Sequence, residues 1–278
     1  MLNRPRKSAF SPYQAVILGL LQGPTELLPI SSSAHTALLP WLARWRHGAI
    51  DPELRKSFQV ALHAGGALAL AIDMRSELAE ELQSLSPRRA TVIALSLTPP
   101  ALAGLVFQRD IERRLGGPRS IAAGLIAGAV AMAFADSPRG GRDRRMEDAD
   151  AGDGLALGLA QALALIPGVS RNGAALTAAR ARGFARSDAQ ALSWHAALPV
   201  ILGASALRAW PLLASGAPKG TGRTLATGAG SAFVSTLAST RLLRRASSGR
   251  SLLPYAVYRL LLALVVLRRL RTPELGEE

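Results

Sequence analysis

The chain alternates between long apolar blocks and short polar segments rich in arginine. The block at 120–135, SIAAGLIAGAVAMAFA, is apolar on every side, whereas a surface helix of a soluble protein keeps one polar face. Other apolar blocks lie near 58–72, 91–107, 190–215, 224–241 and 252–268. Any single block could be a buried helix of a soluble protein, but the whole series predicts an all-α polytopic membrane protein.

Two polar segments interrupt this pattern. QGPTELLPISSSAH (22–35) follows the apolar run AVILGLL, and PGVSRNGAA (167–175) stands in mid-chain. Irregular backbone at membrane depth survives only where it is buried in protein or lines a wet cavity. We therefore predict two re-entrant helical hairpins, at about 13–44 and 154–182. The first forty residues also resemble a secretory signal, but the mid-chain recurrence of the pattern argues against that interpretation.

The two hairpins share a sequence repeat. LGLLQ (18–22) and LGLAQ (157–161) are each followed by a proline with a serine three residues after it: Pro29 and Ser32 in the first case, Pro167 and Ser170 in the second. The repeat predicts two related halves, approximately 1–135 and 154–278, within a single integral membrane domain covering 1–278. The mixed-charge linker between them, 136–153, is interpreted as a solvated loop. Gly124 and Gly128 form a small-xxx-small pair that predicts close helix packing.

Charge and composition narrow the class of partner. The formal net charge is +14, yet no basic patch interleaved with aromatic residues and no zinc-ligand spacing accompanies it. Because the arginines stand between apolar blocks, anionic membrane lipids are the expected partner and nucleic acid is not. The chain has no cysteine, which excludes disulfides and thiol chemistry. Arginine occurs in nearly every loop, so charge bias does not orient the protein.

The first hairpin carries the strongest candidate residues. Glu26 is a carboxylate in a membrane segment, where an ionised group is costly unless it is paired, solvated or metal-bound. Gln22 lies one helical turn earlier on the same face and could share a ligand or a proton with it. Ser31, Ser32 and Ser33 are candidates for capping the next helix, with a second role open for Ser32. His35 alone would be a core histidine, but beside these groups it suggests a catalytic constellation.

The second hairpin supplies a candidate anion site. Arg171 stands at the start of an apolar segment beside Ser170, Asn172 and Gly173. A guanidinium together with backbone N–H groups at a helix N-terminus suits phosphate or an oxyanion. An anionic phosphate would be repelled by Glu26, so a divalent cation between carboxylate and phosphate is the simplest solution.

Other polar residues of the apolar helices receive structural interpretations. His63 and His195 are single histidines on apolar helices, for which packing or a role at a substrate gate is expected rather than ligation. Arg259 on the last helix is interpreted as an interfacial or packing residue.

The two hairpin motifs resemble those of the undecaprenyl-pyrophosphate phosphatase family, the bacitracin-resistance membrane phosphatases. QGPTELLPISSSAH resembles the first signature of that family, and PGVSRNGAA resembles the second, Pro-Gly-x-Ser-Arg-Ser-Gly-Ala. The resemblance extends along nearly the whole chain, through FQVALHAGGALAL, PPALAGLVF, LPVILGAS and LPYAVYRLLLAL. Gln22 stands where glutamate is frequent, Ala34 where glycine precedes the histidine, and Asn172 where serine follows the arginine.

The resemblance implies a specific activity. It implies hydrolysis of the C55 polyprenyl diphosphate to the monophosphate, by an inverted-repeat membrane enzyme whose site opens to the outer face of the plasma membrane. Glu26 with Gln22 would then hold Mg²⁺ or Ca²⁺, His35 and Ser32 would carry out the phosphoryl chemistry, and Arg171 with Ser170 would clamp the diphosphate. Ser31, Ser33, Asn172 and Gly173 are further expected substrate-binding residues. The expected partners are the polyprenyl diphosphate and membrane lipids, with a homodimer as an additional expectation.

Two alternatives remain open from the sequence. An inverted-repeat transporter or flippase of polyprenyl phosphate would also place an anion site at broken helices, although binding alone requires no proton-transfer group such as His35. The nucleophile could be Ser32 with His35 as its base, His35 itself with the roles reversed, or a metal-bound water with Ser32 orienting the phosphate or capping its helix. The components slightly favour the serine.

Overall fold

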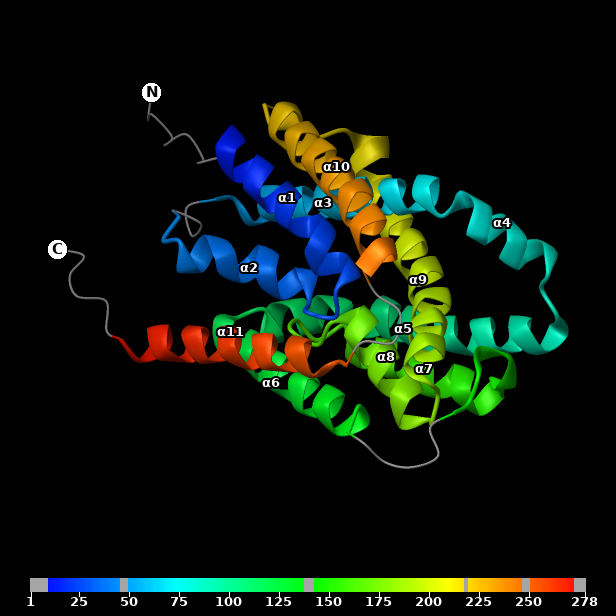
Figure 1. Cartoon of the computed structure of the whole chain (residues 1–278). Coiled ribbons are helices and arrows are strands. Elements are labelled where there is room, and N and C mark those ends of the chain that lie inside the picture. The colour runs from blue at the N-terminus through cyan, green and yellow to red at the C-terminus, as the bar shows by residue number, and fades with distance from the viewer. Residues whose placement is uncertain (1–9, 46–49, 138–142, 218–219, 247–250, 273–278) are drawn as a thin grey trace, which may run out of the picture. The chain divides into compact units, whose positions relative to one another are not determined.

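The computed structural model is built from helices (Figure 1). It describes residues 10–45, 50–137, 143–217, 220–246 and 251–272, and within these ranges no β-strand occurs. The α-helices are α1 (Pro12–Leu27), α2 (Ser32–Leu42), α3 (Pro52–Asp73), α4 (Arg75–Gln83), α5 (Pro87–Leu115), α6 (Pro118–Ala135), α7 (Ala151–Leu163), α8 (Arg171–Ala181), α9 (Arg186–Ser215), α10 (Gly222–Ala246) and α11 (Leu253–Arg271). The all-α prediction is confirmed.

Helix length separates candidate spans from short paired helices. Among the described residues, α5, α6 and α9 are long and apolar enough to cross a membrane, and α3 with α4 would add a fourth span bent by 63°. By contrast, α1, α2, α7 and α8 have 16, 11, 13 and 11 residues, fewer than the roughly 20 that a span requires. The predicted breaks within the two hairpins are therefore present. Because α1 continues to Leu27, the first break falls at residues 28–31, inside the polar segment 22–35.

The helices group into two compact units by their contacts. Unit 1 comprises Met1–Leu27, His35–Glu80 and Ile201–Arg245, and unit 2 comprises Leu28–Ala34, Glu81–Val200 and Ala246–Glu278. Each unit therefore draws helices from both halves of the sequence, and α9 contributes to both.

In unit 1, α1 packs closely against α10 because glycines remove side chains from the contact. A Cβ on Gly23 would lie 2.5 Å from the backbone of Ser235. Pro24 has no N–H and so leaves the Leu20 carbonyl of α1 without its helical donor. The Ser235 hydroxyl donates to that carbonyl at 2.5 Å. The proline is tolerated inside the helix because α10 supplies the missing donor.

In unit 2, a side chain of a neighbouring helix likewise bonds a carbonyl that a proline has freed. Pro99 and Pro100 lie inside α5, and Pro100 frees the carbonyl of Ser96. Gln161 of α7 donates from Nε2 to this carbonyl at 3.2 Å. The approach requires glycine on α7, since a Cβ on Gly158 would lie 2.4 Å from the Leu95 carbonyl.

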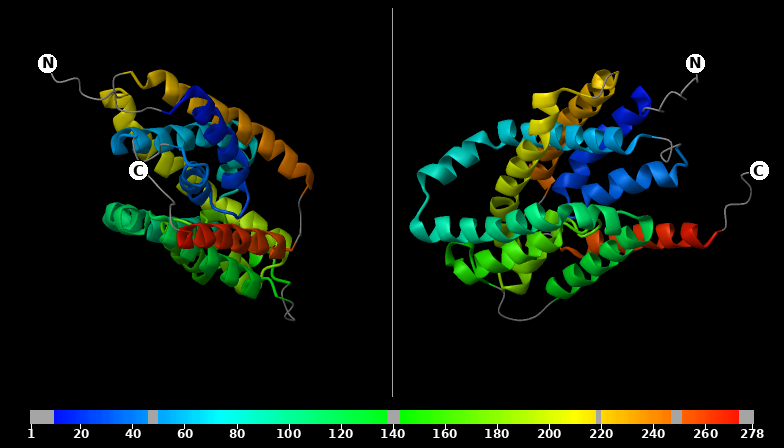
Figure 2. Two further views of the ribbon diagram at one scale, coloured as in Figure 1. Left: turned by 90° about the vertical axis from the view of Figure 1, so that its left-hand side faces the viewer. Right: turned by 180° about the vertical axis from the view of Figure 1, so that it is seen from behind.

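Helices α6 and α11 also lie side by side in unit 2 (Figure 2). The predicted close packing of Gly124 and Gly128 is confirmed. A Cβ on Gly124 would lie 2.4 Å from the Pro167 carbonyl, and a Cβ on Gly128 would lie 1.9 Å from Nη2 of Arg259.

The interpretation of 136–153 as a solvated loop is wrong at both ends. Asp136, which follows α6, is buried and accepts hydrogen bonds from Arg180, Arg186, Ser251 and the Leu252 backbone N–H. Burial raises the pKa of the Asp136 carboxyl, but these bonds, led by that from Arg186, outweigh it and lower the pKa below its ordinary value.

The other end of this segment is equally anchored. Asp153 is fully buried, and Arg144 bonds both of its carboxylate oxygens, at 3.1 and 2.6 Å. Arg182 donates to Asp153 Oδ1 at 2.5 Å. The two end carboxylates of the segment are therefore partners in specific ion pairs, with arginines of α8, of α9, of the connection between them and of the segment itself.

We expect Asp136→Asn to lower the free energy of unfolding at pH 7 by about 3 kcal/mol, because breaking a buried ion pair leaves its cations uncompensated. The folded-state pKa lies below the unfolded value, so the stabilisation is present above the unfolded pKa and is lost as the pH falls through the folded one. The difference between wild type and variant should therefore shrink below about pH 4. Denaturant titration in mixed micelles measures it. Asp110→Asn is the control, because the Asp110 carboxylate is 59% exposed; equal effects of the two substitutions would contradict the prediction.

Candidate active site

Gln22, Glu26 and His63 form a polar cluster inside unit 1. Gln22 Nε2 donates to Glu26 Oε2 at 3.2 Å and lies 3.2 Å from Nδ1 of His63. His63 Nδ1 lies 3.7 Å from the same Glu26 oxygen. Gln22 is buried, and the Glu26 side chain is only 8% exposed. Two residues one turn apart on α1 therefore share a partner on α3.

The oxygen atoms of this cluster are of the kind that binds a hard cation. Both hydrogens of the Gln22 amide nitrogen are directed to Glu26 and His63, and its Oε1 is buried with no hydrogen-bond partner among the described residues. Carboxylate and amide oxygens are the ligands that Mg²⁺ and Ca²⁺ take. The described residues contain no group of three or more histidine, aspartate or glutamate side chains able to hold a metal by themselves. A cation here would complete its shell with water or with phosphate oxygens, as Mg²⁺ commonly does.

His63 contacts both predicted metal ligands, a contact that the sequence analysis did not predict. Two glycines that follow it allow α3 to approach its neighbours. A Cβ on Gly65 would lie 2.1 Å from the Ala229 carbonyl, and one on Gly66 would lie 3.9 Å from Gln22 Cγ. The signal in the sequence was therefore a histidine followed by paired glycines on an apolar helix.

The first turn, residues 28–31, ends in a strained cap. Ser31 is buried and adopts φ 76°, a left-handed conformation that non-glycine residues rarely adopt. Its Oγ accepts a long hydrogen bond of 3.4 Å from Ala34 N and lies 3.2 Å from Ser33 Oγ. The prediction that one of the three serines caps the helix is confirmed for Ser31. Ser32 opens α2 and is half-buried, and His35 follows one turn later with 7% exposure.

The second turn, residues 164–170, also ends in a serine cap. Ser170 Oγ accepts from Gly173 N at 3.1 Å at the start of α8. Asn172 is buried and its Oδ1 accepts from Ser193 Oγ at 2.6 Å, so this oxygen serves packing against α9. Gly173 leaves space that a Cβ would fill, 3.1 Å from Arg259 Nη1.

Arg171 is the first residue of α8 and is half-buried. Within the part of the chain that the structure describes, its guanidinium has no ion-pair or hydrogen-bond partner. It stands where the N–H groups of the first helical turn are also available to a ligand. This combination is suited to an anion such as phosphate.

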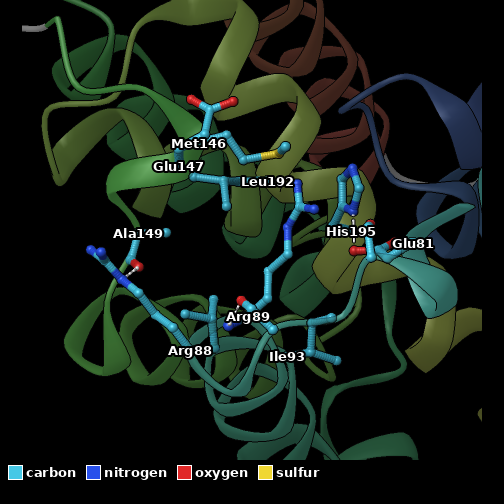
Figure 3. A pocket seen from close by; sticks show the side chains of 12 residues that line it. Glu81, Arg88, Arg89, Ile93, Met146, Glu147, Ala149, Leu192 and His195 are labelled. Carbon is cyan, nitrogen blue, oxygen red and sulfur yellow. Dashed lines mark hydrogen bonds and ion pairs between the residues drawn. The ribbon is translucent and has the colours of Figure 1, made fainter.

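His195 belongs to a different place in unit 2. It lines a cavity of about 340 Å³ with Arg88, Arg89 and Glu81, and its Nδ1 contacts Glu81 Oε1 (Figure 3). Arg88 turns to the Ala149 carbonyl at 2.8 Å. His195 is therefore held by a carboxylate in a mixed-charge pocket, and the sequence interpretation of it as a residue outside the ligand set stands unchallenged.

Fold and site together define a multi-pass helical membrane protein with two polar clusters built around interrupted helices. The chain belongs to the family described as bacitracin resistance protein BacA, which it matches over residues 15–265. A relative from Geobacter metallireducens, named undecaprenyl-diphosphatase, is 38% identical over 263 residues, covering 90% of this chain and 95% of the relative. Relatives with the same name from Geobacter sulfurreducens and Pelobacter propionicus are each 39% identical, over 89% of this chain and 94% and 93% of their own.

The left-handed conformation of Ser31 leads us to expect that glycine at this position is tolerated better than alanine. Ser31→Ala should destabilise the protein by about 1 kcal/mol, because the hydroxyl cap is lost and the left-handed backbone remains. Ser31→Gly should stay within about 0.5 kcal/mol of wild type, because glycine adopts this φ freely. Free energies of unfolding in mixed micelles measure both variants. A glycine variant less stable than the alanine variant would show that the backbone conformation at Ser31 carries no strain.

Proposed function

We propose that this protein hydrolyses undecaprenyl diphosphate to undecaprenyl phosphate and inorganic phosphate, which recycles the lipid carrier of cell-wall synthesis. The observation that carries the proposal is the buried Gln22–Glu26–His63 cluster in a chain of the BacA family. An amide, a carboxylate and an imidazole held together at low exposure are suited to chemistry on a phosphate. The relatives from three organisms, all named undecaprenyl-diphosphatase, supply the substrate.

The competing function, transport or flipping of polyprenyl phosphate, is not favoured. Binding and release of an anion would require the free Arg171 and the amides of α8 but would not require the Glu26 cluster. The relatives are named for hydrolysis.

A divalent cation, Mg²⁺ or Ca²⁺, is the proposed cofactor. Glu26 and the unpartnered Oε1 of Gln22 would hold it, and His63 Nδ1, which accepts a hydrogen bond from Gln22 Nε2 and lies 3.7 Å from Glu26 Oε2, would help to orient them. Such a cation would neutralise charge on the phosphate oxygens. The chain's own contribution is to hold the carboxylate and the amide in one orientation and to exclude most water from them.

Ser32 and His35 are the proposed groups for phosphoryl transfer. Ser31 provides the cap of α2, and Ser32, the first residue of that helix, is the proposed nucleophile. Attack by Ser32 would require a base, and His35 on the same helix is the proposed acceptor of its proton. Arg171, with Ser170, Asn172 and Gly173 at the start of α8, is proposed to bind the diphosphate, and Ser31 and Ser33 would support it from the first turn. We further propose that the site is reached from the outer face of the plasma membrane.

Phosphate release from a polyprenyl diphosphate by the purified protein tests the function. We expect release that stops with a chelator and returns when Mg²⁺ or Ca²⁺ is added. Movement of polyprenyl phosphate across vesicles without any phosphate release would instead establish the transporter.

Glu26→Gln should lower turnover at subsaturating metal by at least about 100-fold, because it removes one of few anionic ligands from a hard-cation site. Metal titration of phosphate release measures the loss, and excess metal should restore part of it. Glu53→Gln is the matched control in the same unit, since Glu53 is exposed in the first turn of α3. Near-wild-type turnover of Glu26→Gln at low metal would remove Glu26 from the metal site.

Arg171→Lys should lower kcat/KM by about 10- to 100-fold although the charge is kept, because an ammonium does not reproduce a two-pronged contact to phosphate. Arg119→Lys is the control, since Arg119 is exposed in the first turn of α6. Kinetics on one diphosphate substrate compare the variants. Equal values for the two variants would mean that Arg171 does not clamp the substrate.

A further inference from the structure

Arg259 is a fully buried arginine in the middle of an apolar helix. It is 1% exposed and is the largest of the fully buried side chains. Within the described residues no carboxylate pairs with it, and its Nε has no hydrogen-bond partner. A buried cation without a counterion is costly, so its retention calls for a specific set of partners.

The partners of Arg259 are backbone carbonyls of both turns. Nη2 donates to the Gly168 carbonyl of the second turn at 2.8 Å, and Nη1 donates a longer bond of 3.4 Å to the Pro29 carbonyl of the first turn. Nη2 also reaches the Gly124 carbonyl of α6 at 3.3 Å. A single guanidinium therefore joins turns that lie far apart in the sequence, and both lie within unit 2.

Electrostatics explain why a cation occupies this position. The first turn follows the C-terminal end of α1 and the second follows that of α7, where orphan carbonyls and the helix dipoles concentrate negative charge. Arg259 also lines an apolar cavity of about 370 Å³, which offers it no other acceptor. In such low-polarity surroundings its bonds to the carbonyls are strengthened.

Two glycines make room for the guanidinium. A Cβ at position 128 of α6 would lie 1.9 Å from Nη2, and a Cβ at position 173 of α8 would lie 3.1 Å from Nη1. Of the two interpretations of Arg259, interfacial or packing, the interfacial one is wrong, because the side chain is buried and the surrounding backbone encloses its charged end.

We propose that Arg259 is a positioning residue that fixes the first turn relative to the second, and so holds Ser32 and Arg171 at the separation that the reaction requires. The first turn leads directly into Ser32, and the second leads directly into Arg171. The expected effect on kcat rests on the proposed phosphatase function, whereas the link between the two turns does not.

The kinetic test uses Arg259→Lys in the full-length protein. An ammonium keeps the charge but does not reach three carbonyls in one plane, so kcat should fall on the order of 100-fold while KM changes by less than about 3-fold. Arg180→Lys is the matched control, because Arg180 is an equally buried arginine of unit 2 that binds Asp136 and the Phe184 carbonyl. Its kcat, measured below its unfolding temperature, should remain near wild type.

The second test changes Gly128, a residue of α6 that lies against the same guanidinium. Gly128→Ala should displace Nη2 and lower kcat as Arg259→Lys does, whereas Gly104→Ala, whose Cβ meets nothing within 4 Å, should not. Because both substitutions act on one contact, their effects should not add in the double variant. Full additivity would overturn the proposal.

A distance measurement separates positioning from stability and from the proposed function. The chain has no cysteine, so spin labels on Leu28→Cys and Leu165→Cys report only the two turns. We expect the distance distribution between the labels to broaden in Arg259→Lys and Gly128→Ala and to stay narrow in Arg180→Lys. A narrow distribution with wild-type kcat in Arg259→Lys overturns the proposal. If the wild-type protein releases no phosphate, the proposed function fails, and the label distances still decide whether Arg259 joins the turns.

Discussion

A backbone carbonyl without a donor is poorly tolerated in an apolar interior, and this constraint organises the molecule. Prolines and helix ends free carbonyls in α1, in α5 and at both turns. Side chains from other helices bond several of these carbonyls: Ser235 bonds Leu20, Gln161 bonds Ser96, and Arg259 bonds the turns. The helices pack where these donors lie. Broken-helix transporters use bound cations beside such helix ends, whereas in this protein the cation is a residue of the chain.

The same constraint distinguishes the two halves of the repeat. Gln22 and Gln161 occupy equivalent positions in LGLLQ and LGLAQ, and each amide nitrogen makes two contacts. Gln161 bonds two backbone carbonyls, so it is structural. Gln22 meets a carboxylate and an imidazole, because Glu26 stands four residues later where the second half has Leu165. The equivalent glutamines of the repeat therefore have different partners, side chains for Gln22 and backbone carbonyls for Gln161.

The sequence predicts those features that depend on residues close together in the chain. The helix breaks follow from polar residues inside apolar runs, and the contact of Gln22 with Glu26 follows from their helical spacing. The partners of His63 and Arg259 were missed because they are distant in sequence, and a single arginine on an apolar helix looks like one that reaches the headgroups. The burial of Asp136 was missed for the same reason, since mixed charge is typical of a solvated loop until its arginine partners are known.

The interleaving of the two units has a consequence for biosynthesis. The helices of unit 1 at the N-terminus, α1 to α3, pack with α10 and the end of α9, and the whole of 81–200 is translated in between. At typical rates of synthesis this interval lasts on the order of ten seconds. During that time α1 lacks the α10 hydroxyl that bonds its Leu20 carbonyl. The Leu20 carbonyl therefore lacks this donor until α10 has been synthesised, and insertion machinery or lipid headgroups must supply a hydrogen bond to it in the meantime.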